Sequence, residues 1–217
     1  ANKKKEMIEI EIARFFIGFA VLAYASYTDI KTREASNFLW IFLSFIGVIF
    51  LFSYNPDDFF KIIISISVSF LIGLLLYFSG MGGADVKAIW AISLLRPLSN
   101  DIFFIFPVSV LINSLFLILP LPLIFFIYNA YRKNLEFPYC FFGYKMKADI
   151  AKNSFVWAME KDGKKSITPQ KDVDLSSYGS KEIWVTPQLP FLLFIFFGYI
   201  TAFIFGNFLF AIFSFFK

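Results

Sequence analysis

Two aspartates, Asp29 and Asp85, have the side-chain type and the setting to do chemistry in this chain. Asp29 ends the first long apolar run of the sequence, and Asp85 begins the fourth. A carboxylate beside hydrocarbon is costly and is usually functional. Two carboxylates a few ångströms apart share a proton, so that one accepts a proton from water while the other donates to a carbonyl oxygen. This chemistry hydrolyses amides without a metal or cofactor, and we expect neither.

Three glycines, Gly80, Gly82 and Gly83, come shortly before Asp85. A residue without Cβ lets the backbone turn tightly and approach another chain closely. A peptide must be extended to be cleaved, and free backbone groups beside Asp85 would pair with it as a strand does. At the start of a helix, the helix dipole would also favour the ionised form of Asp85.

The composition removes most other hydrolytic mechanisms. The chain has no His and a single Cys, Cys140, which excludes Ser-His and Cys-His hydrolases, HExxH metalloproteases and paired-cysteine zinc sites. It is also 59% hydrophobic, with 33 Phe among 217 residues, whereas soluble domains are roughly 45–50% apolar. A lipid bilayer can solvate so much apolar surface, and we therefore expect a membrane protein.

Two motifs resemble those of the type IV prepilin peptidases, which are GxGD-type membrane aspartic peptidases. The run GMGGADVKA at residues 80–88 resembles their second motif, GMGxGDxK followed by a small or apolar residue. Asp29, followed eight residues later by Asn37, resembles their first. The resemblance implies that Asp29 and Asp85 are the catalytic pair. It further implies that several motif residues lie on the approach of the substrate: Gly80, Gly82, Gly83, Ala84, Lys87 and Asn37.

Details of the motifs favour the archaeal branch of that family, the preflagellin (prearchaellin) peptidases. Ala84 stands where bacterial members have Gly, and the chain lacks their cysteine-rich zinc domain. Ala35-Ser36 replaces the usual Ile-Pro before the Asn. The implied substrate is the basic leader of a preflagellin or prepilin-like precursor, cut at the cytoplasmic face. The expected partners are this precursor and the lipid bilayer. We expect no nucleic-acid partner.

Other interpretations remain open. A presenilin-like intramembrane peptidase also uses two aspartates, and a small polytopic transporter can carry membrane acids, although more often near the midplane. Lys87 is interpreted either as an interfacial anchor or as a contact for substrate or lipid headgroups. Asn37 is interpreted either as a helix cap or as a residue beside the active site.

Six apolar runs are long enough, or nearly so, to span a bilayer, which takes about 20 residues. They are Ile8–Tyr27, Asn37–Tyr54, Phe59–Phe78, Ala84–Leu98, Ile102–Tyr131 and Pro190–Phe216. The fifth run, interrupted by Pro107, Pro120 and Pro122, could instead form two elements. We therefore predict an all-α polytopic membrane protein of about six transmembrane helices, with a small β-rich cytoplasmic insertion before the last helix. The predicted domains are residues 1–131, 132–188 and 189–217.

The insertion is the one polar stretch of the chain. Its alternating runs Ser154–Ala158 and Glu182–Thr186 predict strands, and residues 161–164 predict a turn. With six spans, this insertion would share one membrane face with Lys31, Arg33 and Lys87. The positive-inside rule assigns that face to the cytoplasm, which would place the active site on the cytoplasmic side of the cell membrane.

The beginning of the chain carries charges close to the first apolar run. Glu9, Glu11 and Arg14 are expected to reach the lipid headgroups from the first turns of a helix. Met7 stands just before the run, which leaves open whether residues 1–6 are native.

Overall fold

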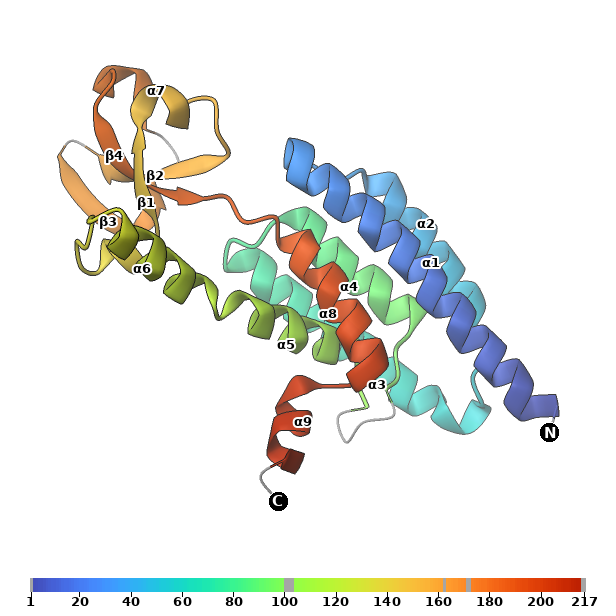
Figure 1. Ribbon diagram of the computed structural model, residues 1–217. Coiled ribbons are helices and arrows are strands. Elements are labelled where there is room, and N and C mark those ends of the chain that lie inside the picture. The colour runs from blue at the N-terminus through green and yellow to red at the C-terminus, as the bar shows by residue number, and fades with distance from the viewer. Residues whose placement is uncertain (1, 100–103, 162, 171–172, 216–217) are drawn as a thin grey trace. The chain divides into compact units, whose positions relative to one another are not determined.

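The computed structural model describes residues 2–99, 104–161, 163–170 and 173–215. The chain forms two compact units, whose elements are drawn in Figure 1. The first, here called the helical unit, comprises Ala1–Leu117 and Pro190–Lys217. The second, here called the sheet unit, comprises Ile118–Leu189.

The helical unit is built from long apolar helices joined by short connections. Its helices are α1 (Asn2–Thr32), α2 (Asn37–Leu51), the short 3₁₀ helix η1 (Pro56–Asp58), α3 (Phe59–Phe78), α4 (Gly83–Leu95), α5 (Phe106–Ile118), α8 (Phe191–Phe205) and α9 (Phe208–Phe215). Helix α5 reaches the boundary between the two units.

Helix α4 is at the centre of the helical unit. Helices α2 and α3 pack along it, α1 packs along α8, and α4 also contacts α1 and α8 (Figure 1). The α4 side chains Ala88, Ile89, Ile92 and Leu95 are completely or almost completely buried. Because Asp85 is on the first turn of this helix, the core packing of α4 fixes where the carboxylate lies.

The outer faces of these helices remain apolar. Phe45 on α2, Phe70 and Leu71 on α3, and Phe16 on α1 are among many large apolar side chains that are exposed. Exposed apolar surface of this extent needs a partner that is itself apolar. The acyl chains of a bilayer are such a partner, in agreement with the predicted membrane location.

The prediction of an all-α membrane protein with about six transmembrane helices is wrong in its number of spans. Among the described residues, two helical stretches are long and apolar enough to cross a membrane: Pro56–Phe78, which joins η1 and α3, and Phe106–Tyr131, which joins α5 and α6 (Leu121–Tyr131). Helices α2 and α8 have 15 residues each and α4 has 13. At the rise of an α-helix they reach roughly 20–23 Å, short of a hydrocarbon core of about 30 Å.

The two longest apolar runs of the sequence are interrupted in the structure. The run Ile102–Tyr131 contains two elements, because α5 ends at Ile118 and α6 (Leu121–Tyr131) starts after Pro120. The run Pro190–Phe216 is divided at Gly206, whose φ of 72° ends α8. The prolines of the first run had left two elements open, and the structure has two, whereas the break at Gly206 was not predicted.

The sheet unit confirms the predicted β-rich insertion. It consists of α6, η2 (Tyr139–Phe141), β1 (Tyr144–Lys147), α7 (Ala148–Ala151), β2 (Val156–Lys161), β3 (Lys164–Gln170), η3 (Leu175–Tyr178) and β4 (Glu182–Pro187). The strands form an antiparallel sheet in the order β1-β4-β2-β3.

Both faces of the central strand β4 are covered. Ile183 and Val185 pack on Ala148 and Ala151 of α7, whereas Trp184 packs with Cys140 and Met159 in a separate cluster. Successive residues of a strand point to opposite faces, so this short strand supplies two small cores. The thiol of Cys140 is buried and free.

Candidate active site

Asp29 lies in the last turns of α1 and is held by the start of α8. The backbone N–H of Leu192 donates to Oδ2 of Asp29 over 3.3 Å. Leu192 is the second residue of α8, which begins after Pro190, so its N–H has no acceptor within its own helix. The hydroxyl of Ser26, one turn earlier on α1, donates to the carbonyl of Leu192 over 3.0 Å. Two hydrogen bonds therefore fix Asp29 against the N-terminus of α8.

The surroundings of the Asp29 carboxyl act on its pKa in both directions. Partial burial raises the pKa above 3.8, while the Leu192 N–H and the guanidinium of Arg33 lower it. Arg33 follows the last residue of α1 in the left-handed region, with φ of 58°. Asp29 thus has two groups beside it that stabilise its ionised form.

Asp85 has a more strongly shifted pKa. Burial raises it from 3.8 to about 7, with a further contribution from the nearby Asp29 charge, whereas a hydrogen bond from the Gly82 backbone lowers it. Both aspartates lie outside the two candidate membrane spans. Since the charge of Asp29 acts on Asp85, the structure brings both carboxyls to the same end of the helical unit. The two environments differ, and the pKa of Asp85 is raised further than that of Asp29. Unequal pKa values in a pair favour a state in which the two carboxyls share one proton.

Gly80 ends α3 in a way that requires glycine. Its φ is 93°, a value that side-chain-bearing residues rarely adopt. The N–H of Gly80 bonds to the carbonyl of Tyr77 and the N–H of Met81 to that of Leu76, both at 3.0 Å. This is the Schellman pattern of helix termination. Gly80 therefore turns the chain from α3 toward the helix that carries Asp85.

Gly82 and Gly83 have different roles at the start of α4. Gly82 is the N-cap residue, and a Cβ at this position would lie 2.8 Å from Oδ2 of Asp85. A Cβ on Gly83 would meet only the Tyr77 ring at 3.8 Å, an ordinary contact. Ala84 packs at the edge of the main core. Of the three residues before Asp85, Gly82 alone must be glycine for the carboxylate to keep its place.

Lys87 and Asn37 form a direct contact between α4 and α2. Nζ of Lys87 donates to Oδ1 of Asn37 over 2.7 Å, and both residues are exposed. The cap of α2 is Ser36, whose hydroxyl accepts from the N–H of Phe38, so the interpretation of Asn37 as a cap is wrong. The contact ties the beginning of α2 to the first turns of α4, close to Asp85.

Sequence reasoning missed two groups that act on Asp29, the Leu192 N–H and the Arg33 guanidinium. The signal for the first was present, since Pro190 before an apolar run marks a helix start with free N–H groups. Nothing in the sequence indicated which side chain would accept a hydrogen bond from the Leu192 N–H. Within the described part of the chain, no three His, Cys, Asp or Glu side chains gather to hold a metal ion.

Comparisons with known proteins match nearly the whole chain. Residues 16–123 match the model of the type IV leader peptidase family, and residues 135–208 match the archaeal peptidase A24 C-terminus, type II. The preflagellin peptidase of Methanococcus maripaludis is 32% identical over 89% of this chain and 95% of its own length. The preflagellin peptidase of Methanocaldococcus jannaschii is 31% identical over 89% of this chain and 94% of its own length. The preflagellin peptidase of Methanococcus voltae is 32% identical over 87% of this chain and 93% of its own length.

Proposed function

We propose that this chain, which belongs to the type IV leader peptidase family, uses Asp29 and Asp85 as the catalytic pair of an aspartic endopeptidase. As a member of this family it is a membrane protease that removes leader peptides. The observation that carries the proposal is the unequal pair of carboxyls: the pKa of Asp85 is raised to about 7, partly by the charge of Asp29.

The different surroundings of the two carboxyls support separate roles. Asp29, with the Leu192 N–H and Arg33 beside it, is the ionised member and the general base. Asp85, which is more deeply buried and faces the charge of Asp29, is the protonated member and the general acid. Environments that shift the pKa values of two acids by different amounts assign such roles in general.

The reaction is a direct attack of water on the scissile amide. Asp29 takes one proton from the water, whose oxygen forms the new bond to the carbonyl carbon. Asp85 gives its proton to the carbonyl oxygen, which yields a neutral tetrahedral intermediate. When this collapses, the hydroxyl proton returns to Asp85, and the proton on Asp29 passes to the leaving amine. Both carboxyls end in their starting states.

We further propose that the substrate is the leader of a preflagellin-type precursor and that cleavage takes place at the cytoplasmic face. The named activity of the three relatives supports the substrate class. Lys31, Arg33 and Lys87 surround the aspartate end of the helical unit, and the positive-inside rule associates such residues with the cytoplasm.

The test is cleavage of a Methanococcus preflagellin by the purified full chain in detergent. Asp29→Asn and Asp85→Asn should each lower kcat by at least about 10³-fold, since proton transfer and charge both fail. Asp57→Asn, at an exposed position of η1, is the matched control and should cleave normally. Circular dichroism and size-exclusion chromatography must show that all variants fold. A folded Asp29 or Asp85 variant within tenfold of the wild type would contradict the mechanism.

The face of the membrane is tested by labelling. Ser36→Cys places a thiol at an exposed position beside the site, and the native Cys140 is buried. An impermeant maleimide should label Ser36→Cys in inverted membrane vesicles and leave it unlabelled in right-side-out vesicles. The opposite result would reverse the assignment of the face without touching the catalytic pair.

A further inference from the structure

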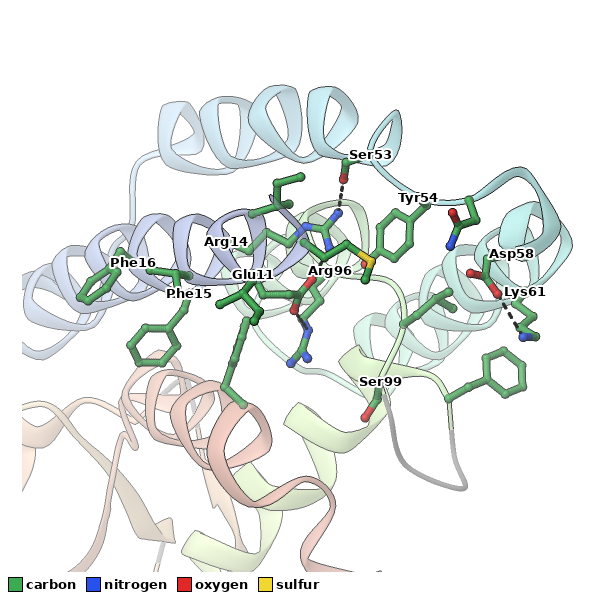
Figure 2. Close-up of a pocket in the computed structure, with 18 of the residues that line it drawn as sticks. Glu11, Arg14, Phe15, Phe16, Ser53, Tyr54, Asp58, Lys61, Arg96 and Ser99 are labelled. Atoms are coloured by element: carbon green, nitrogen blue, oxygen red, sulfur yellow. Dashed lines mark hydrogen bonds and ion pairs between the residues drawn. The ribbon is translucent and has the colours of Figure 1, made fainter. Parts of the chain in front are cut away.

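The helical unit contains a second polar region, at the opposite end from the aspartates. A pocket of about 910 Å³ lies between the first turns of α1, the end of α2, the start of α3 and the segments that follow α4 and end α8 (Figure 2). Glu11, which lines it, is about 27 Å from Asp29 along α1 at the rise of an α-helix. A pocket of this size is at the upper end of the range for small-molecule sites. Neither aspartate lines it.

Two buried arginines in this pocket share a single carboxylate. Arg14 and Arg96 are 2% and 9% exposed, and Glu11 forms an ion pair with each of them. Figure 2 shows Glu11 close to Arg14 and Arg96. Two guanidinium groups and one carboxylate leave one positive charge in excess. At the rim of the pocket, Asp58 is paired with Lys61 at 3.1 Å. The charge of Asp58 is therefore already balanced and does not neutralise the excess positive charge of the two arginines.

Some donors of the two guanidinium groups have no protein acceptor. Nε of Arg14 is buried and, within the described residues, has no hydrogen-bond partner. Nε of Arg96 lies 2.9 Å from Oε2 of Glu11, but the pair is not aligned as a hydrogen bond. The Arg96 guanidinium otherwise stacks on the rings of Phe203 and Phe106, at 3.9 and 4.4 Å. Both Nε atoms are inaccessible from the pocket, and Nη2 of Arg14 donates to the Phe50 carbonyl and to the Ser53 hydroxyl, both at 2.9 Å. The cluster therefore offers an anionic ligand its excess positive charge and the terminal nitrogens of Arg96.

The same pocket opens along an apolar stripe. Ile8, Ile12 and Phe16 are spaced four residues apart on α1 and therefore lie on one face of it. They are 52%, 50% and 62% exposed, and all three line the pocket. Ile204 continues this apolar surface on α8. A small inorganic anion would leave this apolar surface exposed, whereas an alkyl chain would bury it.

We propose that this pocket binds a membrane lipid with an anionic phosphate head group. The phosphate oxygens accept from the terminal nitrogens of Arg96, the negative charge neutralises the excess charge of the cluster, and one acyl chain lies along the stripe of Ile8, Ile12 and Phe16. Arginine is well suited to phosphate because its planar fork offers paired donors. The site is separate from the aspartate pair and does not depend on the cleavage reaction.

The first experiment measures ligand-induced stabilisation of the purified full chain in a neutral detergent. Dioctanoyl phosphatidylglycerol should raise Tm saturably by several degrees, because a ligand that binds only the folded state stabilises it. Dioctanoyl phosphatidylcholine has the same chains without net charge, and inorganic phosphate has the charge without chains. Both should give less than about a third of that shift. An equal shift with phosphatidylcholine, or with inorganic phosphate, would overturn the proposal.

Variants separate ligand binding from a purely structural role of the cluster. Glu11→Gln removes the competing carboxylate, so phosphatidylglycerol should raise its Tm by more than it raises that of the wild type. Ile8→Glu puts a negative charge at an exposed position of the pocket and should weaken binding by about tenfold. Ile30→Glu, exposed near the other end of α1, is the matched control. If Glu11→Gln responds no more than the wild type, or Ile8→Glu binds as Ile30→Glu does, the proposal is wrong.

Discussion

The two ends of the helical unit bury charged groups in opposite ways. At one end Asp29 and Asp85 are like charges that lie near each other, and burial combined with mutual repulsion raises the pKa of Asp85 to about 7. At the other end Arg14, Arg96 and Glu11 have opposite charges in ion pairs, with aromatic rings over both guanidinium groups. In the proposed mechanism the first arrangement keeps a proton available for transfer, whereas in the second the ion pairs hold the charged groups in place.

This difference shows what each end contributes. An uncompensated acid pair is an unfavourable element of a fold, and it is retained where the shifted pKa is needed for chemistry. An ion-paired cluster contributes little to stability relative to apolar residues, but removing its one carboxylate is costly because both guanidinium groups stay buried. Mutations at the two ends should therefore have opposite effects on stability, which the following experiments examine.

The largest stability effect is expected at the arginine end, for Glu11→Gln. The substitution leaves two buried guanidinium groups without their carboxylate, and the free energy of unfolding should fall by about 3 kcal/mol. Thermal unfolding in lipid-free detergent measures this. Glu9→Gln on the same helix removes only an exposed contact with Lys5 at 3.9 Å and should change nothing. Equal stability of the two variants would mean that the arginines do not need Glu11.

The pH dependence of cleavage probes the aspartate end. The proposed mechanism requires ionised Asp29 and protonated Asp85, so the rate should fall above the pKa of Asp85, about 7, as that proton is lost. The expected loss is about 100-fold over the two pH units above it. On the acidic side the rate should fall as Asp29 takes up a proton. Initial rates of preflagellin cleavage between pH 4 and pH 9 test this, and a flat profile above pH 7 would exclude Asp85 as the acid.

Asp85→Asn should stabilise the protein as pH rises. The pKa of Asp85 is raised in the folded state, from 3.8 to about 7, so its contribution to stability is complete below 3.8 and is lost as pH rises through about 7. Between pH 5 and pH 8 the wild type should lose about 3 kcal/mol that the Asn variant retains. Chemical unfolding of both proteins at the two pH values measures the difference. A parallel decline in the two proteins would assign it to other groups.

The glycines before Asp85 allow a finer test within the aspartate end. In Gly82→Ala the new methyl group presses on Oδ2 of Asp85, and we expect kcat to fall by about tenfold while the fold is kept. Gly83→Ala meets only an ordinary contact and should stay within about twofold of the wild type. The comparison of kcat values is informative because both variants add the same group one residue apart. Reversed effects would show that the glycines serve the substrate instead of the carboxylate.

The smallest effect is expected for Lys87→Met. The substitution removes an exposed hydrogen bond to Asn37, which is worth about 0.5–1 kcal/mol. Unfolding experiments measure this loss, and Lys31→Met provides a control at another exposed lysine of the same end. A loss above about 3 kcal/mol, the range of buried pairs, would show that the contact between α2 and α4 is structurally dominant.

Local sequence pointed to the activity. The motifs around Asp29 and Asp85 resemble those of a peptidase family, and the family match confirms a leader peptidase. That the two aspartates are its catalytic pair stays a prediction. Alternation of apolar residues likewise predicted strands at β2 and β4. These signals were readable because each depends on residues that are neighbours in the chain: a turn, a cap or a strand is specified within a few positions.

Tertiary structure decided the rest. The donor to Asp29 comes from Leu192, far along the chain. The sequence placed Glu11 and Arg14 in the first turns of a helix, but only the fold buries Arg14 beside Arg96 and pairs both with Glu11. The predicted number of spans also failed, because composition defines apolar runs but not where helices end within them. Pairing of distant charges and termination of helices depend on which elements pack together, and only the folded chain brings those partners within reach.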